Sequence, residues 1–288
     1  MIKLSIIIVN YNSKEFLPRN LDALRRYLAK IPHEVIIADN ASFDGSTEMI
    51  LKLYPEVTLL HNTQNKGFAA AVNQGIKLAQ GEFIVWLNPD TELLDEGFET
   101  LLHYMEAHPD TAIMGPQIVN PDGSVQLSCR SFPSHETALF NRYSLLTKIF
   151  PSNPRSRKYL NTGWNHTEIR EVDWVSGACL MHRASLIKNI GGLDETFFMY
   201  CEDVDFCLRA RNSGFKTLYH PGAKVLHHIA GSSRKTPRKM IAERHKSMWH
   251  YYRKHYPRNI FIDAVTGAVI KTRAALLILA SHLAGRKK

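Results

Sequence analysis

The sequence lacks the signatures of several protein classes. Its four cysteines form no C-x-x-C pair, which argues against structural zinc and against a disulfide scaffold. The apolar run near the N-terminus is too short for a signal peptide, so we expect reduced thiols in an intracellular protein. Charged residues make up 22% and apolar residues 44% of the chain, which excludes a disordered or collagen-like protein. The 288 residues allow one large domain with an appendage, or two small domains.

Two common nucleotide-binding motifs are also missing. The sequence contains neither G-x-G-x-x-G after a first strand nor the phosphate-binding G-x-x-x-x-G-K-[ST]. A nucleotide bound to this chain would therefore be held by side-chain carboxylates, with or without a metal ion, rather than by a glycine-rich loop.

The first half of the chain alternates short apolar runs with helical patterns. Runs rich in β-branched residues alternate with segments whose apolar residues recur every three or four positions. This alternation predicts an α/β fold with a mostly parallel sheet and helices on both faces. The predicted strands and helices cover, in order, residues 4–9, 17–28, 35–38, 46–54, 57–60, 68–79 and 83–87.

Polar side chains follow three of the predicted strands. In such sheets ligands bind beyond the carboxyl ends of the strands, where these residues lie. Turn formation explains any one of these loops alone, but three at one edge predict a binding site. Asp39 can accept hydrogen bonds from an imide N–H or from sugar hydroxyls, whereas Asn88 and Asp90 offer oxygen ligands for Mg²⁺ or Mn²⁺. The three loops contain Asn10, Tyr11 and Asn12; Asp39, Asn40, Ser42 and Asp44; and Asn88 and Asp90.

An acidic cluster is formed by Glu202, Asp203 and Asp205. Repulsion between such close carboxylates is expected to raise some of their pKa values, so that one can act as a general base near neutral pH. Acidic residues also favour a helix N-terminus. We expect the cluster to serve both roles, with a helix that continues from it to Gly214 and with Asp203 facing the cleft of the predicted binding site. The ligand spacing of an EF-hand is missing.

Two adjacent histidines, His227 and His228, follow an apolar run. Imidazole nitrogens at the end of a strand can ligate a metal ion or bind phosphate. A hydrogen-bonded structural role is the alternative, and the sequence leaves the choice open.

Basic charge is concentrated near the end of the chain. From Arg234 to Lys288 there are 14 Lys and Arg but only two acidic residues, whereas the preceding part is slightly acidic. An apolar helical face over residues 260–283, beside this charge, predicts an interfacial helix on an anionic membrane. The longest unbroken apolar run there is too short to cross a bilayer. Packing on the rest of the chain or in a homodimer is the alternative, and the absence of any nucleic-acid motif argues against nucleic-acid binding.

Five segments carry a resemblance to a known family, and their order and spacing are more specific than any one of them. Together, across residues 2–233, they resemble the family 2 glycosyltransferases, which have the GT-A fold. They are most similar to the rhamnosyltransferase-like enzymes that build bacterial surface polysaccharides. The resemblance implies a catalytic domain over residues 1–233 and a basic, amphipathic helical extension over residues 234–288. The segments are Val9–Asn12, Asp39–Ser46, Asn65–Asn73, Asn88–Asp90 and Gly191–Asp205.

The resemblance also implies a role for each candidate residue. Asp203 is the catalytic base, Asp90 and His227 bind Mg²⁺ or Mn²⁺, and His228 is the alternative to His227. Asn88 stands where the family has a first aspartate, so metal binding is expected to be weaker unless diphosphate is present. The donor-binding residues are Asn10, Asn12, Asp39, Asn40, Asp44, Lys66, Gly67, Asn73 and Asn88, and the acceptor side is Trp174, Gly177 and Glu202.

These roles imply an inverting glycosyltransferase that uses a nucleotide-diphosphate sugar, with dTDP-rhamnose as the expected donor. The expected acceptor is a glycan or lipid-linked sugar at the cytoplasmic face of the cell membrane, to which the enzyme binds peripherally. A metal-dependent sugar-phosphate nucleotidyltransferase is an alternative, but it needs a glycine-rich basic loop near the N-terminus, and residues 2–21 contain no glycine. A non-catalytic membrane-binding module is a third reading, and it would not need Asp90, Asp203 and His227 together.

Overall fold

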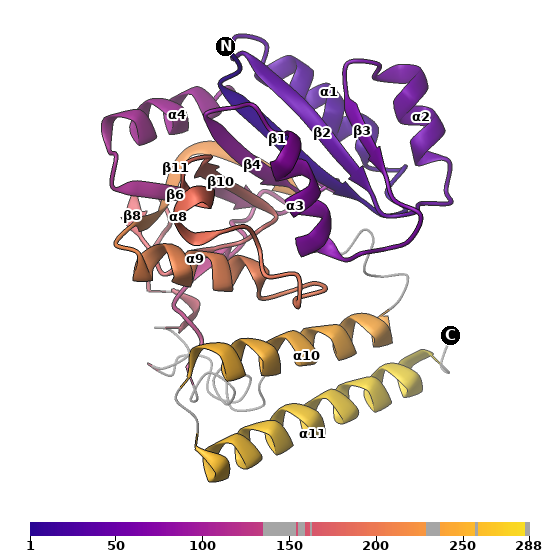
Figure 1. Ribbon diagram of the computed structural model, residues 1–288, viewed down its shortest axis with the longest axis vertical. Helices are drawn as coiled ribbons and strands as arrows, with labels where there is room; N and C mark the ends of the chain where they lie inside the picture. Colours follow the sequence, from indigo (N-terminus) through magenta and orange to yellow (C-terminus); the bar gives the residue numbers. More distant parts are fainter. Residues whose placement is uncertain (135–153, 155–158, 162, 229–236, 257–258, 286–288) are drawn as a thin grey trace.

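A mixed β-sheet runs through the computed structural model and carries helices on both faces (Figure 1). The structure describes residues 1–288 except 135–153, 155–158, 162, 229–236, 257–258 and 286–288. Its elements are β1 (Leu4–Asn10), α1 (Leu17–Tyr27), β2 (His33–Asp39), α2 (Ser46–Leu53), β3 (Thr58–His61), α3 (Phe68–Leu78), β4 (Phe83–Leu87), β5 (Thr91–Leu93), α4 (Phe98–Ala107), β6 (Thr111–Val119), β7 (Cys129–Arg130), β8 (Arg170–Glu171), β9 (Trp174–Val175), β10 (Cys179–Arg183), α8 (Leu186–Ile190), α9 (Glu202–Asn212), β11 (Lys216–His227), α10 (Pro237–His255) and α11 (Ile260–Gly285).

The strands are continuous apolar runs because both faces of the sheet are covered. Along β1 the side chains alternate, so that Ile6 and Ile8 enter one hydrophobic core and Ile7 enters the other. Residues of α1, α2 and α4 fill the first core, and residues of α3, α8 and α9 fill the second. The predicted α/β fold, with its elements between residues 4 and 87, is confirmed with boundary shifts of one or two residues.

The strand order is β3-β2-β1-β4-β10-β6-β11-β5, with β8 paired to β11. Strands β1 to β4 are parallel to one another, and β6 is parallel to β11. By contrast, β10 runs antiparallel to both β4 and β6, and β5 runs antiparallel to β11. The parallel half places the carboxyl ends of β1, β2 and β4 at one edge, because Asn10 pairs with Asp39 and Leu87 pairs with Ile8.

Helices α10 and α11 lie against each other below the sheet and its flanking helices (Figure 1). The predicted helical extension is therefore present, although its predicted boundary at residues 233/234 lies outside the described residues. Tyr251 of α10 enters the second core, and Tyr252 donates a hydrogen bond to Asp263 of α11 at 3.1 Å. Helix α10 thus packs on the body of the protein. Among the helices that the structure describes, none combines the length and apolarity needed to cross a membrane.

Candidate active site

Asn10 and Asp39, at the ends of the neighbouring strands β1 and β2, form a fully buried polar pair. Asn10 Nδ2 donates to Asp39 Oδ1 at 2.7 Å and to Ser46 Oγ at 2.8 Å. Asp39 Oδ2 accepts the Ser42 N–H at 3.1 Å and lies 3.2 Å from His61 Nδ1. Both carboxylate oxygens therefore have protein partners already, and the side chain is fully buried, so a contact between Asp39 and a nucleotide base stays a prediction.

The loop after β2 is fixed by Asn12 and Asp44. Asn12 Oδ1 accepts the Phe43 N–H at 2.9 Å, which joins the loop after β1 to the loop after β2. Asp44 accepts the backbone N–H groups of Lys14 and Ser46 at 2.9 and 3.0 Å. Burial raises the pKa of Asp44, but these hydrogen bonds outweigh it and hold the pKa below its usual value. Asp44 thus shapes the loop as an ionised acceptor.

The start of α3 is attached both to β2 and to the segment before α9. Asn40 Nδ2 donates to Gly67 O at 3.0 Å, and Asn40 Oδ1 accepts the Lys66 N–H at 3.4 Å. Gly67 has a φ of 88°, and a Cβ there would lie only 2.4 Å from Phe198 O. The Phe68 N–H donates to the same carbonyl at 2.7 Å. Only glycine fits at position 67, because a side chain would push the two segments apart.

Asn73 of α3 binds the backbone of Leu193, in the segment before α9. Its Nδ2 donates to Leu193 O and its Oδ1 accepts the Leu193 N–H, both at 2.8 Å. The Nδ2 group also donates to Glu195 Oε1 at 2.9 Å. Its amide is therefore engaged with the protein, and its role in donor binding stays a prediction.

Asp90 and His227 come together because β5 pairs with the end of β11. His227 Nε2 lies 3.5 Å from Asp90 Oδ1, whereas His228 Nε2 is 3.0 Å from Glu92 Oε1. The imidazole beside the Asp90 carboxylate is thus that of His227, whereas His228 contacts Asp90 through its backbone N–H, which donates to Asp90 O at 2.9 Å. Asn88 precedes this pair, and its N–H donates to Ala178 O at 2.9 Å.

The pair of Asp90 and His227 fits a divalent cation shared with a ligand. Neighbouring ligands around Mg²⁺ or Mn²⁺ are about 3 Å apart, close to the separation found here. In the described part of the chain, no group of three or more His, Cys, Asp or Glu side chains is placed to hold a metal. Two protein ligands suit a cation that completes its shell with diphosphate oxygens and water.

Asp203 lies in the first turn of α9, after two residues with left-handed backbone. Tyr200 and Cys201 have φ values of 72° and 68°, which non-glycine residues adopt only when the surrounding structure holds them. Asp203 Oδ2 accepts the Gly177 N–H at 3.0 Å. Burial raises the pKa of Asp203, and the hydrogen bonds from Gly177 and Val204 oppose it only in part. The structure thus agrees with the expected raised pKa, although burial is a larger cause than repulsion.

The two other carboxylates of the cluster differ from each other. Burial, and then the charge of Asp203, raise the pKa of Glu202 well above its usual value, and within the described residues Glu202 Oε2 has no hydrogen-bond partner. Burial also acts on Asp205, but His255, Lys254 and Arg209 at 2.7–2.8 Å outweigh it and lower the pKa. Asp205 is therefore an ionised link between α9 and α10, a role that the sequence analysis missed.

On the predicted acceptor side, Gly177 and Trp174 have different surroundings. Gly177 contacts Asp203 directly, so it belongs to the same site. Trp174 is buried, and its Nε1 donates to Ser131 O at 2.9 Å while its ring lies 5.4 Å from the Arg130 guanidinium carbon. The indole thus supports the strand pair β7–β9, and an acceptor contact stays a prediction.

Several of the candidate residues lie along one edge of the sheet. Asp39 contacts Asn10, and β1 lies between β2 and β4. Beyond β4, Asn88 contacts Ala178, whose neighbour Gly177 contacts Asp203.

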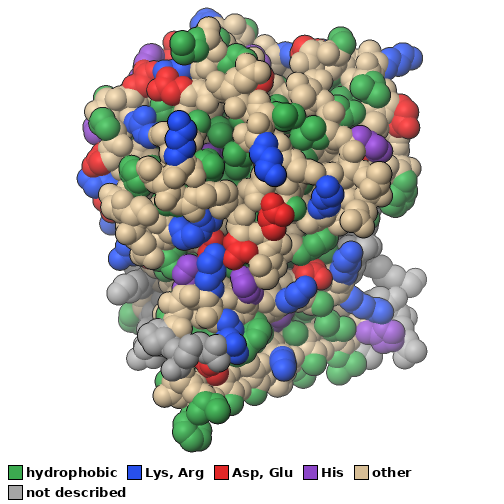
Figure 2. Space-filling model, in the orientation of Figure 1, with side chains coloured by type: hydrophobic (Ala, Val, Ile, Leu, Met, Phe, Trp, Pro, Cys, Tyr) green, Lys and Arg blue, Asp and Glu red, His purple; other side chains and the backbone are tan. Residues whose placement is uncertain are grey.

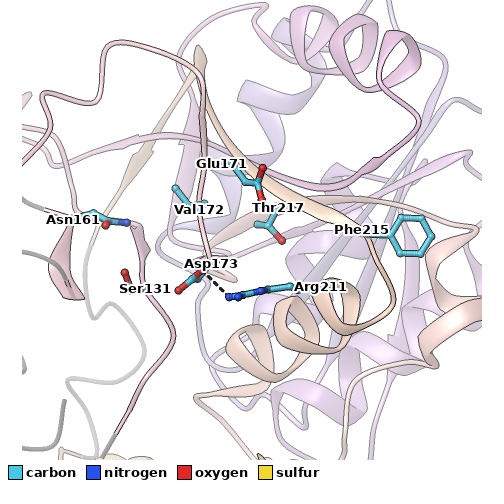
Figure 3. Close-up of a pocket in the computed structure, with 8 residues that line it drawn as sticks. All are labelled: Ser131, Asn161, Glu171, Val172, Asp173, Arg211, Phe215 and Thr217. Carbon is cyan, nitrogen blue, oxygen red and sulfur yellow. Dashed lines mark hydrogen bonds and ion pairs between the residues drawn. The ribbon is translucent and has the colours of Figure 1, made fainter. Parts of the chain in front are cut away.

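A pocket of about 310 Å³ lies elsewhere, where Arg211 of α9 pairs with Asp173 at 3.1 Å (Figure 3).

Known proteins resemble this chain in sequence and in fold. The model of glycosyl transferase family 2 matches residues 5–187. The N-acetylglucosaminyl-diphospho-decaprenol L-rhamnosyltransferase of Mycobacterium tuberculosis is 34% identical over 85% of this chain and 82% of its own length. Rhamnosyltransferase WbbL of Escherichia coli is 26% identical over 85% of this chain and 91% of its own.

Two solved structures share the fold. The structure of GalNAc-T7 with UDP, GalNAc and Mn²⁺ matches with a TM-score of 0.58 and 18% identity, over 79% of this chain and 44% of that one. The structure of S. aureus TarS residues 1–349 with UDP matches with a TM-score of 0.53 and 14% identity, over 93% of this chain and 70% of that one. At these identities the likeness concerns the fold alone.

Proposed function

Because this chain belongs to glycosyl transferase family 2 and is a glycosyltransferase of polysaccharide synthesis, we propose that it transfers L-rhamnose from dTDP-rhamnose to a lipid-linked or glycan acceptor. The names of the two rhamnosyltransferases above support the choice of sugar, and the first name supports a lipid-linked acceptor. The family assignment also sets aside the nucleotidyltransferase and the non-catalytic module.

The observation that carries the mechanism is the partly buried carboxyl of Asp203, which accepts the Gly177 N–H at 3.0 Å. Asp203 removes the proton from an acceptor hydroxyl while that oxygen attacks the anomeric carbon of the donor. The attack comes from the face opposite the leaving nucleoside diphosphate, so that the configuration inverts. A raised pKa makes this carboxylate a stronger base than an exposed aspartate at the same pH.

The donor would be held at the edge formed by Asn10, Asp39 and the start of α3. A cation held by Asp90 and His227, Mg²⁺ or Mn²⁺, would supply positive charge for the leaving diphosphate. Asn88 carries no charge, so we expect the free protein to bind Mn²⁺ weakly and the protein with nucleoside diphosphate to bind it more tightly.

The mechanism is tested with Asp203→Asn, which keeps an oxygen for the Gly177 N–H but cannot take a proton. We expect kcat to fall by about 10²- to 10⁴-fold with donor affinity nearly unchanged. Asp110→Asn, at an exposed carboxylate paired with Lys216, is the matched control and should keep full activity. An active Asp203→Asn enzyme would overturn the assignment. In the wild-type enzyme kcat should decline as the pH falls below the raised pKa of Asp203, because only the deprotonated carboxylate is a base.

We also propose that α11 binds the inner face of the cell membrane peripherally. Its side chains Phe261, Val265, Leu276 and Leu279 recur at helical spacing, and each is more than half exposed. Figure 2 shows hydrophobic side chains along the lower edge of the molecule, with Lys and Arg side chains above them. An apolar stripe beside basic residues suits an anionic bilayer, to which each basic residue near the surface adds about 1 kcal/mol.

Vesicle binding tests this surface. Val265→Ser and Leu276→Ser should each weaken binding to vesicles of phosphatidylglycerol by roughly tenfold, since each removes about 1.5 kcal/mol of apolar burial. Leu51→Ser removes an equally exposed leucine from α2 and should change nothing. We expect the wild-type protein to bind anionic vesicles in a salt-sensitive way and not to bind DNA. A dimer that Leu276→Ser dissociates, without vesicle binding, would assign the stripe to a second copy of the chain.

A further inference from the structure

The second ring nitrogen of His227 is held by a residue that the sequence analysis did not single out. His227 Nδ1 lies 2.8 Å from Gln126 Oε1, on the side of the ring opposite to Asp90. A neutral imidazole carries its proton on one nitrogen only, and the other can donate its lone pair to a metal. The orientation of the Gln126 amide therefore decides which nitrogen faces the cation site.

A chain of hydrogen bonds that starts at Asp122 fixes this orientation. The hydroxyl and backbone N–H of Ser124 donate to Asp122 Oδ1 at 2.6 and 2.9 Å, and these bonds lower the pKa of Asp122, so that it is an ionised acceptor. The Ser124 hydroxyl proton is thereby used, and its oxygen accepts from Asn120 Nδ2 at 2.9 Å. Asn120 Oδ1 is then left for Gln126 Nε2, also at 2.9 Å. Gln126 Oε1 consequently faces His227 and needs a donor there.

The backbone holds the members of this chain in register. They belong to the turn after β6, in which the Asn120 N–H donates to Ser124 O at 2.8 Å and the Gln126 N–H donates to Ile118 O at 2.8 Å. Strand β6 is the parallel neighbour of β11, whose last residue is His227. The sheet therefore places the turn beside the imidazole without help from a ligand.

We propose that Gln126 is a positioning residue that holds His227 with its proton on Nδ1 and the lone pair of Nε2 directed at the cation site beside Asp90. The inference rests on the cation site of the proposed function. An acceptor behind a histidine ligand fixes both the ring orientation and the tautomer, and its loss typically lowers metal affinity by about 10- to 100-fold.

The variants Gln126→Leu and Gln126→Glu separate this role from simple packing. Leucine fills similar space but offers no acceptor, whereas the glutamate carboxylate still accepts the Nδ1–H. Nitrogen NMR of protein labelled at histidine, with the His227 signals assigned by their loss in His227→Asn, reports the tautomer without any metal. Mn²⁺ binding, followed by electron paramagnetic resonance with and without dTDP, reports the affinity.

We expect wild-type protein and Gln126→Glu to show the Nδ1–H tautomer and similar Mn²⁺ affinity. Gln126→Leu should lose the single tautomer and bind Mn²⁺ about 10- to 100-fold more weakly. The proposal is overturned if His227 of the wild type carries its proton on Nε2, or if Gln126→Leu keeps either the tautomer or the Mn²⁺ affinity. A wild type that has the Nδ1–H tautomer but binds no Mn²⁺, even with dTDP, would instead refute the cation site of the proposed function, and with it the cation part of this inference.

Discussion

Acid should destabilise this protein through His182, which is buried as a neutral imidazole in β10. The ring is fully buried, and its centroid lies 5.2 Å from that of Trp86 and 5.1 Å from that of Phe206, both edge-on. Its Nδ1 lies 2.9 Å from Arg183 O, and Nε2 has no hydrogen-bond partner within the described residues. Burial lowers the pKa of His182 from 6.5 to about 4, because the charged ring would lose its hydration.

The change in stability with pH follows from the difference between the pKa of His182 in the folded protein and in the unfolded chain. Between pH 6.5 and about 4 the unfolded chain binds a proton at His182 that the folded protein does not bind. The free energy of unfolding therefore falls as the pH falls, by about 1.4 kcal/mol per pH unit below 6.5. From pH 7 to pH 5 the loss is about 2 kcal/mol, a large part of the ~5–15 kcal/mol that stabilises a typical domain.

Urea denaturation of the wild type and of His182→Leu, at several pH values between 5 and 7.5, measures this contribution. Leucine is close to histidine in volume and carries no titrating group, so all other acid-sensitive groups cancel when the two proteins are compared. We expect the wild type to lose about 2 kcal/mol more than the variant between pH 7 and pH 5. Two parallel curves would refute the reasoning, since they would mean that His182 is protonated alike in the folded and unfolded states.

Three further substitutions test the site. Gly67→Ala should lower stability by about 1–3 kcal/mol and abolish transfer, because its Cβ would meet the carbonyl of Phe198; unchanged urea denaturation would contradict this. Asp205→Asn should cost about 1.5–3 kcal/mol, because Arg209 and Lys254 lose the charge of this buried partner although Lys254 keeps Asp194, and an unchanged urea denaturation would argue against the link. Glu202→Gln should cost less stability than Asp205→Asn, because burial raises the pKa of Glu202 and so favours its uncharged carboxyl, which glutamine resembles; a larger loss in the same assay would contradict this.

The sequence predicted the parallel half of the fold well because burial on both faces leaves an unbroken apolar run. Ile6–Val9 and Phe83–Leu87 are such runs, and both lie in strands. The antiparallel β10 was not predicted, since Cys179–Arg183 contains a histidine and an arginine and no period marks its partner strands. Which strands become neighbours is decided by packing between distant segments, which local patterns do not record.

The sequence predicted that the candidate residues lie at one edge of the sheet, but not which partners each side chain contacts. Polar residues after β1, β2 and β4 do gather at one edge of the sheet, as the order of elements implied. The contact partners of individual side chains could not be predicted, because they lie far apart in the sequence. Asn73 contacts Leu193, and Asp205 contacts Lys254. The sequence indicated no role for Gln126, since a single glutamine in a loop belongs to no recognisable motif.

The link between α9 and α10 has a consequence for protein engineering. One short helix carries Asp203 at its start and, two positions later, the carboxylate that Lys254 and His255 of α10 bind. A chimera that receives the C-terminal helices of another glycosyltransferase would bring new side chains to that buried carboxylate. Grafts of this kind should therefore exchange α9 and α10 as one block, with the crossover placed upstream of Tyr200, so that the helix that carries Asp203 stays with the helix that supports it.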